Sequence, residues 1–109
     1  MSKDQKQNED QEEDKEASEA PKMIDIASLP IWQIIPFFMG ILDRVAWQKI
    51  GLVVNPTSQE IEKDLEQAHL AIDAYEYLLG QVSKQLEQET RQAFEARLTD
   101  LKLNYAKQA

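Results

Sequence analysis

The stretch GLVVNPTSQEIEKDLEQAHLA, residues 51–71, decides the fold that this sequence predicts. Gly51 can adopt the left-handed backbone conformation that ends a preceding helix. The Asn-Pro pair that follows indicates a turn, because proline keeps the residue before it out of the helical region. Thr57 and Glu60 then have the spacing of a capping box, in which two side chains satisfy free amides at a helix start. The stretch therefore predicts a helix end, a turn and a new helix.

Hydrophobic periodicity predicts two helices after this turn. We expect the middle helix over residues 58–79 and the last over residues 83–107, with Gly80 as the stop between them. Apolar residues recur at spacings of four and three in both, which gives each helix a continuous seam. Because the connection is short, the two helices are expected to form an antiparallel αα-hairpin with facing seams, as in a coiled coil. The seams are Ile61, Leu65, Ala68, Ile72, Tyr75 and Leu79, and Phe94, Leu98, Leu101 and Tyr105.

Residues 24–50 hold most of the apolar side chains and predict a first helix, with a kink or restart near Pro36. On a helical wheel its polar arc is narrow and holds Gln33, Asp43, Arg44 and Gln48. A hairpin can cover only one side of such a helix, and exposed apolar patches usually mark interaction sites. We therefore expect an interface here, with one tyrosine that lies off the main seam of the middle helix as a further contact. The candidate interface residues are Ile31, Ile34, Phe38, Ile41, Leu42, Val45, Trp47 and Tyr77.

The predicted fold class is all-α, a small domain of three helices behind an acidic tail. Residues 1–22 carry eight acidic and four basic side chains and almost no apolar ones, so we expect this tail to be disordered. Residues 23–109 form the expected helical domain and contain twelve acidic and eight basic side chains. Each part thus contributes −4 to the net charge of −8.

The amino-acid composition limits the classes of partner and the cellular compartment that we expect for this chain. The acidic balance and the lack of a basic patch argue against nucleic-acid binding. The chain has no cysteine and no apolar stretch at its N-terminus, so we expect a cytoplasmic protein without disulfides or a signal peptide. The hydrophobic run of residues 29–42 is too short to span a membrane, and charged residues follow it at once.

The sequence offers no catalytic constellation, and we expect no enzymatic activity, no cofactor and no metal. The glycines are too far apart for a phosphate loop, and no serine lies in a nucleophile elbow. Glu66 and His69 have the Glu-x-x-His spacing of di-iron helical bundles. Glu66 is expected to point away from the seam, however, so the favoured interpretation is a histidine on the flank of the seam near Asp73.

Two segments resemble an uncharacterised bacterial family, the domain of unknown function 1844. They are GLVVNPTSQEIEKDLEQAHLAID, residues 51–73, and LTDLKLNY, residues 98–105. The similarity covers most of residues 24–105. Ser58 stands where the family commonly has a glycine. The resemblance implies a helical domain and no known chemistry.

Two functional hypotheses follow. The first is a protein-interaction module that forms a homo-oligomer, with a dimer favoured, through its first helix; an unidentified protein partner is a related possibility. The alternative is a peripheral membrane adaptor with residues 29–50 as an interfacial anchor. Such anchors usually carry several lysines and arginines on the polar face. This segment offers only Arg44 and Lys49, which favours the first hypothesis.

Overall fold

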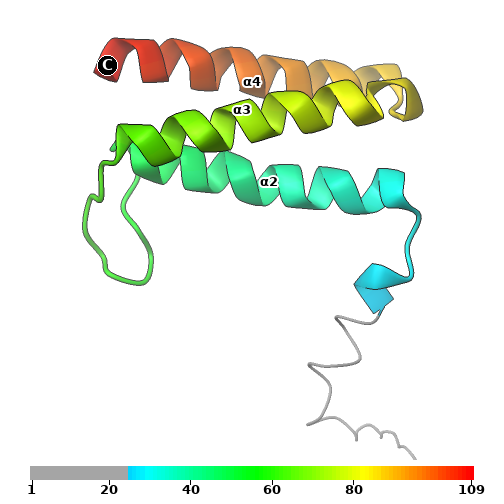
Figure 1. Cartoon of the computed structure of the whole chain (residues 1–109), viewed down its shortest axis with the longest axis horizontal. Helices are drawn as coiled ribbons and strands as arrows, with labels where there is room; N and C mark the ends of the chain where they lie inside the picture. Colours follow the sequence, from blue (N-terminus) through cyan, green and yellow to red (C-terminus); the bar gives the residue numbers. More distant parts are fainter. Residues whose placement is uncertain (1–24) are drawn as a thin grey trace, which may run out of the picture. The chain divides into compact units, whose positions relative to one another are not determined.

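A computed structural model describes residues 25–109, and all regular secondary structure within that range is helical (Figure 1). The predicted all-α class is thereby confirmed. The predicted disorder of residues 1–22 lies outside the described residues. The described residues divide into two units, 25–34 and 35–109, and each is described by itself. Among the described residues, no helix is long and apolar enough to cross a membrane.

Helix α2 spans Ile31–Ile50 and continues without a break through Pro36. Of the kink or restart expected near this proline, the restart does not occur. Proline removes only one amide donor, here in the second turn, and the hydrogen bonds on either side carry the helix past it.

The end of α2 is the one that the sequence predicts. Gly51 has a φ of 96°, in the left-handed region. Its amide donates to the Gln48 carbonyl at 3.1 Å, and the Leu52 amide donates to the Trp47 carbonyl at 3.4 Å. This pair of hydrogen bonds is a Schellman motif. A Cβ atom at Gly51 would lie 3.1 Å from side-chain carbons of Lys63, so the packing here also favours glycine.

The capping box at Thr57 and Glu60 is a wrong prediction. The Asn55 side-chain oxygen accepts the amide of Thr57 at 2.8 Å, which folds these residues into a turn. Gln59 then has a φ of 61°, which no α-helix can accommodate. The apolar seam is correspondingly shorter than predicted, because Ile61 is exposed in the loop.

Helix α3 begins later, at Leu65, and Asp64 is its N-cap. The Asp64 carboxylate accepts the Gln67 amide at 3.2 Å, and the Gln67 side chain donates to the same carboxylate at 2.8 Å. The hydrogen bond from the Gln67 amide is the main reason that the pKa of Asp64 lies below its usual value. The Asp64 amide also donates to the Lys49 carbonyl at 2.8 Å, which ties the start of α3 to the end of α2.

The hairpin that follows is antiparallel, as predicted, but its turn lies further along the chain. Helix α3 spans Leu65–Val82, the 3-10 helix η2 spans Ser83–Gln85, and α4 spans Gln88–Gln108. Gly80 was expected to stop the middle helix and does not. It lies inside α3, which continues to Val82, a residue that is buried in the core.

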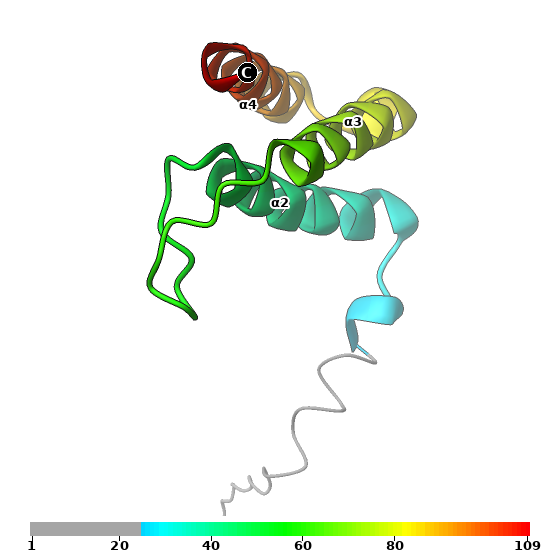
Figure 2. The same ribbon diagram turned by 60° about the vertical axis from the view of Figure 1, so that its left-hand side comes forward.

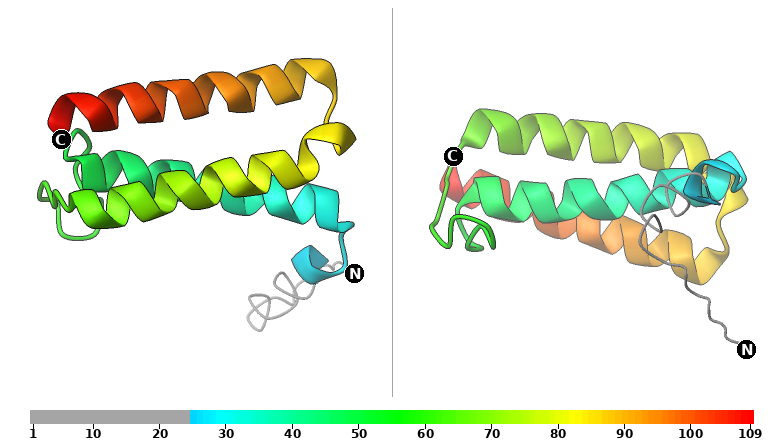
Figure 3. Two further views of the ribbon diagram at one scale, coloured as in Figure 1. Left: turned by 45° about the horizontal axis from the view of Figure 1, so that its top comes forward. Right: turned by 90° about the horizontal axis from the view of Figure 1, so that it is seen from below.

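The three helices pack side by side in the unit of residues 35–109, and α2 runs parallel to α4 and antiparallel to α3 (Figures 1, 2 and 3). Their core consists of two clusters that meet at Leu42 and Leu98. One lies around Met39 and Tyr75, and the other around Ile50 and Leu101. The predicted seams are confirmed from Ala68 to Leu79 in α3 and at the positions expected in α4. The buried or partly buried seam residues are Ala68, Ile72, Tyr75, Leu79, Phe94, Leu98, Leu101 and Tyr105.

Candidate interaction surface on helix α2

The face of α2 that packs against the hairpin carries a charged residue. Met39, Asp43, Ala46 and Ile50 are buried at spacings of four, three and four. Asp43, which the helical wheel assigns to the narrow polar arc, is thus buried against the hairpin with apolar residues. Its Oδ2 atom accepts a hydrogen bond from Arg97 Nη1 of α4 at 3.3 Å. Its Oδ1 atom is buried and has no hydrogen-bond partner among the described residues. Helical-wheel reasoning assigns residues by polarity alone, so it could not foresee this cross-helix ion pair.

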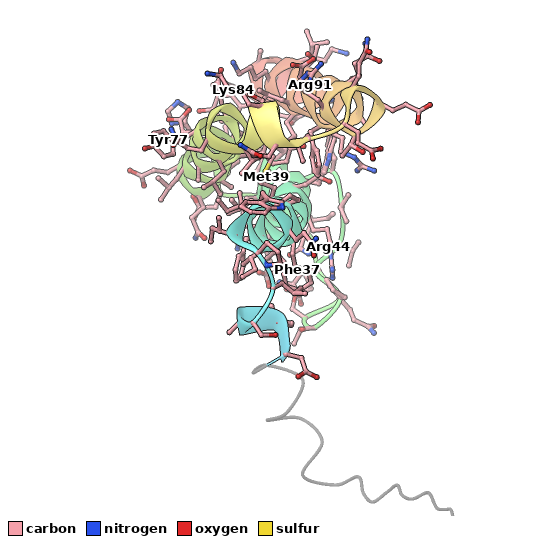
Figure 4. The ribbon with its side chains drawn as sticks, turned by 90° about the vertical axis from the view of Figure 1, so that its right-hand side faces the viewer. Phe37, Met39, Arg44, Tyr77, Lys84 and Arg91 are labelled. Carbon is pink, nitrogen blue, oxygen red and sulfur yellow. The ribbon has the colours of Figure 1, made fainter. Side chains whose placement is uncertain are left out.

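The opposite side of α2 is apolar and exposed. Phe37, Phe38 and Ile41, which we call the outward face, keep 52%, 48% and 40% of their surface accessible. The two phenylalanine rings meet edge to face with centroids 5.6 Å apart. Figure 4 shows Met39 among the three helices, whereas Phe37 lies on the side of α2 that is turned away from α3 and α4. Large apolar side chains are thus placed in solvent beside a core that contains a carboxylate.

Of the predicted interface residues, the structure brings Phe38 and Ile41 together on the outward face. Leu42, Val45 and Trp47 instead pack, partly buried, against the core. These three are therefore shared between the fold and any interface.

The remaining predicted interface residues lie elsewhere. Ile31, which is exposed, and Ile34, which is half-buried, belong to the first unit of the chain. Tyr77 is exposed on α3 and points away from the other helices (Figure 4). It does not extend the outward face. Sequence reasoning missed Phe37, although its spacing of four from Ile41 places the two on neighbouring parts of one helix face.

A cleft of about 580 Å³ lies between α2 and α4 and is lined in part by Tyr75 of α3. Its lining combines apolar residues with four charged ones. The Tyr75 hydroxyl donates to the Phe94 carbonyl at 3.1 Å, and burial raises the pKa of Tyr75 to about 12. The lining residues are Pro36, Gly40, Asp43, Arg44, Tyr75, Glu89, Thr90, Ala93, Phe94 and Arg97.

The loop after α2 exposes further apolar side chains. Leu52, Val53 and Val54 are each nearly half exposed. A second cleft, of about 330 Å³, separates part of this loop from α2 and is lined by Arg44, Trp47, Gln48, Val53, Val54 and Pro56. The loop is held by Asn55, whose amide donates to the Glu60 carbonyl at 2.9 Å and whose side chain donates to Glu62 at 3.1 Å. The exposed valines are therefore presented on an ordered turn.

The histidine lies where the favoured interpretation put it. His69 Nδ1 is 3.4 Å from the Asp73 carboxylate, one turn along α3, and both side chains are exposed. Among the described residues, no group of three or more His, Asp or Glu side chains is placed to hold a metal ion.

The family model of DUF1844, a domain of unknown function, matches residues 35–107. The resemblance of the two sequence segments to this family is thereby confirmed. The matched range begins in α2 and includes the hairpin, so it coincides with the unit that holds the core and the outward face. No curated protein and no solved structure matches the chain.

Proposed function

The chain belongs to the DUF1844 family, a family of domains of unknown function, and we propose that its helical domain is a non-enzymatic self-association module. The observation that carries this proposal is the outward face of α2. Phe37, Phe38 and Ile41 lie adjacent on one helix, each with 40% or more of its surface in solvent. Exposed apolar clusters of this kind mark interaction sites.

The energetics favour covering this face. Burying a large apolar side chain contributes about 1.5–3 kcal/mol, and roughly half of that remains to be gained by a half-exposed one. A second copy of the chain presents the same patch, and a twofold dimer buries both at once. The like charge of the two acidic chains would then oppose further association.

Membrane anchoring is less well supported by the geometry. An interfacial helix uses lysine and arginine around its apolar face to contact lipid phosphates. Lys49 is engaged with Glu62, with 3.6 Å between Nζ and Oε1, and its side chain is 81% buried. That leaves Arg44 as the one exposed cation in residues 35–50.

The test is the molar mass of the full chain at tens of micromolar, measured by light scattering on a sizing column. We expect the wild type to be a dimer and Phe38→Glu to be a monomer with unchanged helicity by circular dichroism. Leu70→Glu is the matched control, because Leu70 is the same kind of exposed apolar residue, at 70%, but lies on α3. It should leave the dimer intact.

A monomeric wild type would contradict the proposal, as would a dimer that Phe38→Glu leaves unchanged. The same proteins should be mixed with anionic phospholipid vesicles. Vesicle binding by a monomeric wild type, abolished in Phe38→Glu, would instead establish the membrane alternative.

A further inference from the structure

A line of residues along α2 joins the outward face to the loop that follows the helix. At about 100° per residue, Phe37, Ile41 and Arg44 lie within about 60° of one another around the helix axis, and Gln48 continues the same line. In Figure 4, which looks nearly along α2, Phe37 and Arg44 lie on the same side of the helix, with the loop beside Arg44. The loop extends past α2 on the side that is turned away from α3 and α4 (Figures 1 and 2).

The cleft of about 330 Å³ between this loop and α2, which we call the loop cleft, lies where the line of residues meets the loop. Arg44, Trp47 and Gln48 form its α2 side, and Val53, Val54 and Pro56 form its loop side. These side chains suit an aromatic ring, because valine and proline offer apolar contact and a guanidinium is attracted to the face of a ring. The loop cleft can therefore hold a phenyl group.

The chain does not place its own Phe37 in the loop cleft. Phe37 lies seven residues before Arg44, about 10 Å along the helix. Helical side chains also lean toward the N-terminus of their own helix, which here is away from the loop. A ring in the loop cleft must therefore come from another molecule, and a second copy of the chain carries an exposed Phe37.

A twofold axis that crosses α2 at Ile41 fills the loop clefts of both copies at once. This axis makes the two helices antiparallel, so that residues before Ile41 in one copy meet residues after Ile41 in the other, along the same line. Phe37 is four residues before Ile41, about 6 Å, and its lean carries the ring further, to a level between Arg44 and Gln48 of the other copy. Ile41 lies between Phe37 and Phe38 around the helix, so the crossing also covers the outward face.

A parallel pair lacks this fit. Its twofold axis runs along the helices, so Phe37 of each copy lies at the level of Phe37 of the partner subunit, and the two loops lie at the same end. Each loop cleft then stays about 10 Å or more along the helix from any Phe37.

We propose that a second copy of the chain packs its α2 antiparallel on the outward face, crossing at Ile41, and that Phe37 of each copy enters the loop cleft of the partner subunit. Arg44 then meets the ring of the partner's Phe37. The inference rests on the proposed self-association and specifies its geometry.

The loop also supplies interface area that the outward face lacks. A stable interface buries at least about 1,000 Å² in total, more than three half-exposed side chains on each copy can provide. Leu52, Val53 and Val54 of the loop are each nearly half exposed. In the antiparallel pair the loop of each copy lies beside the Phe37 end of the other α2, which makes one continuous contact from the outward face to the loop.

The chain has no cysteine, so disulfide trapping can read this geometry directly. The double variant Phe37→Cys with Val53→Cys places two thiols that meet across the antiparallel interface, and oxidation of the full chain should give a covalent dimer on a non-reducing gel. Within one chain the two positions cannot pair, because a disulfide needs Cα atoms within about 7 Å and Phe37 lies about 10 Å or more from the loop cleft along the helix. Each disulfide traps a dimer as it forms, so the signal survives the loss of the two rings.

The single variants distinguish the antiparallel from the parallel arrangement. Phe37→Cys alone and Val53→Cys alone should each give at least about tenfold less covalent dimer than the double variant, because identical positions lie about 12 Å or more apart in the antiparallel pair. The control is Tyr77→Cys with Val53→Cys, in which the second thiol is exposed on α3 instead. It should remain monomeric on the gel.

A second measurement is the dimer dissociation constant from sedimentation equilibrium of the full chain. Phe37→Ala should raise it about tenfold or more, because the change removes two anchoring rings from each dimer. Tyr77→Ala is the matched control, since Tyr77 is also an exposed aromatic residue, at 66%, but lies on α3. It should leave the dissociation constant unchanged, and both variants should keep the helicity of the wild type.

The outcomes separate this inference from the proposal on which it rests. A monomeric wild type contradicts self-association itself. A wild-type dimer that Phe38→Glu dissociates retains self-association, and the antiparallel crossing is overturned if the Phe37→Cys, Val53→Cys variant then gives no more covalent dimer than the control with Tyr77→Cys. Cross-linking of Phe37→Cys alone to the same extent as the double variant also overturns it, as does an unchanged dissociation constant in Phe37→Ala.

Discussion

Both sides of α2 carry large apolar side chains, and folding of a single chain accounts for only one of them. The side toward the hairpin buries Met39 and Ile50 together with Asp43, whereas the side toward solvent exposes Phe37, Phe38 and Ile41. A helix that served only its own core would place the phenylalanines inside and the carboxylate outside. The difference supports the proposal that α2 has two partners, the hairpin of its own chain and a second copy that covers the outward face.

The largest contrast between the two sides should be in stability. Met39→Ala removes a fully buried side chain and should lower the free energy of unfolding by about 2–5 kcal/mol. Phe38→Ala, one residue away, should change the unfolding of the monomer by no more than about 0.5 kcal/mol. Urea denaturation at a concentration below dimerisation measures both. Equal losses for the two variants would place Phe38 in the core of its own chain.

The second contrast concerns the buried charge. Arg97→Ala leaves the Asp43 carboxylate in a buried site without its hydrogen-bond donor, which should cost about 1–3 kcal/mol of unfolding free energy. In the background of Asp43→Leu the same Arg97→Ala change should cost little, because no charge then remains to be paired. An equal cost of Arg97→Ala in both backgrounds would show that the arginine acts independently of Asp43.

Tyr75 makes the core beneath α2 sensitive to alkaline pH. Its pKa is raised from 10.0 to about 12, mainly by burial, so the folded state holds the phenolic proton more tightly than the unfolded state. The resulting stabilisation is complete below pH 10 and is lost as the pH rises from 10 to 12. Tyr75→Phe should remove this part of the pH dependence, at a cost of about 1 kcal/mol for the hydrogen bond to Phe94. Urea denaturation at pH 9 and at pH 11 measures this change in unfolding free energy. If Tyr75→Phe loses as much stability between the two pH values as the wild type does, other groups cause the loss.

The smallest effect concerns the loop that joins α2 to the hairpin. Asp64→Ala should lower the thermal midpoint by a few degrees, because Asp64 caps α3, whereas Thr57→Ala should leave it unchanged. Since the pKa of Asp64 is depressed in the folded state, its contribution is present above pH 3.8 and is lost on acidification below that value. If Thr57→Ala lowered the thermal midpoint more than Asp64→Ala, the helix would begin at the Thr57 capping box, which the structure excludes.

The sequence predicts the helices well and their boundaries less well. Periodicity identifies the seams of α3 and α4, because the spacing of apolar residues is a direct consequence of helix geometry. The capping-box spacing of Thr57 and Glu60 predicts a helix from residue 58, but the actual cap is Asp64, which has the same spacing to Gln67. The choice between them depends on the Asn55 side chain, which captures the amide of Thr57 and so excludes a helix there.

The candidate surface was predicted in part, for a similar reason. The number of apolar residues on α2 correctly predicted that the hairpin would leave some of them exposed, among them Phe38 and Ile41. It could not determine which residues the hairpin does cover. That assignment depends on contacts between distant parts of the chain, such as the Asp43–Arg97 pair, whose members are 54 residues apart. A polar residue that is buried through a distant partner has no local signal in the sequence.

The most direct test of the two-partner account of α2 is sedimentation equilibrium of the wild-type full chain over a series of micromolar concentrations. The account predicts a reversible monomer–dimer equilibrium whose mass approaches twice that of the chain as concentration rises. A single species with the mass of one chain at every concentration would contradict it, because the outward face would then remain in water.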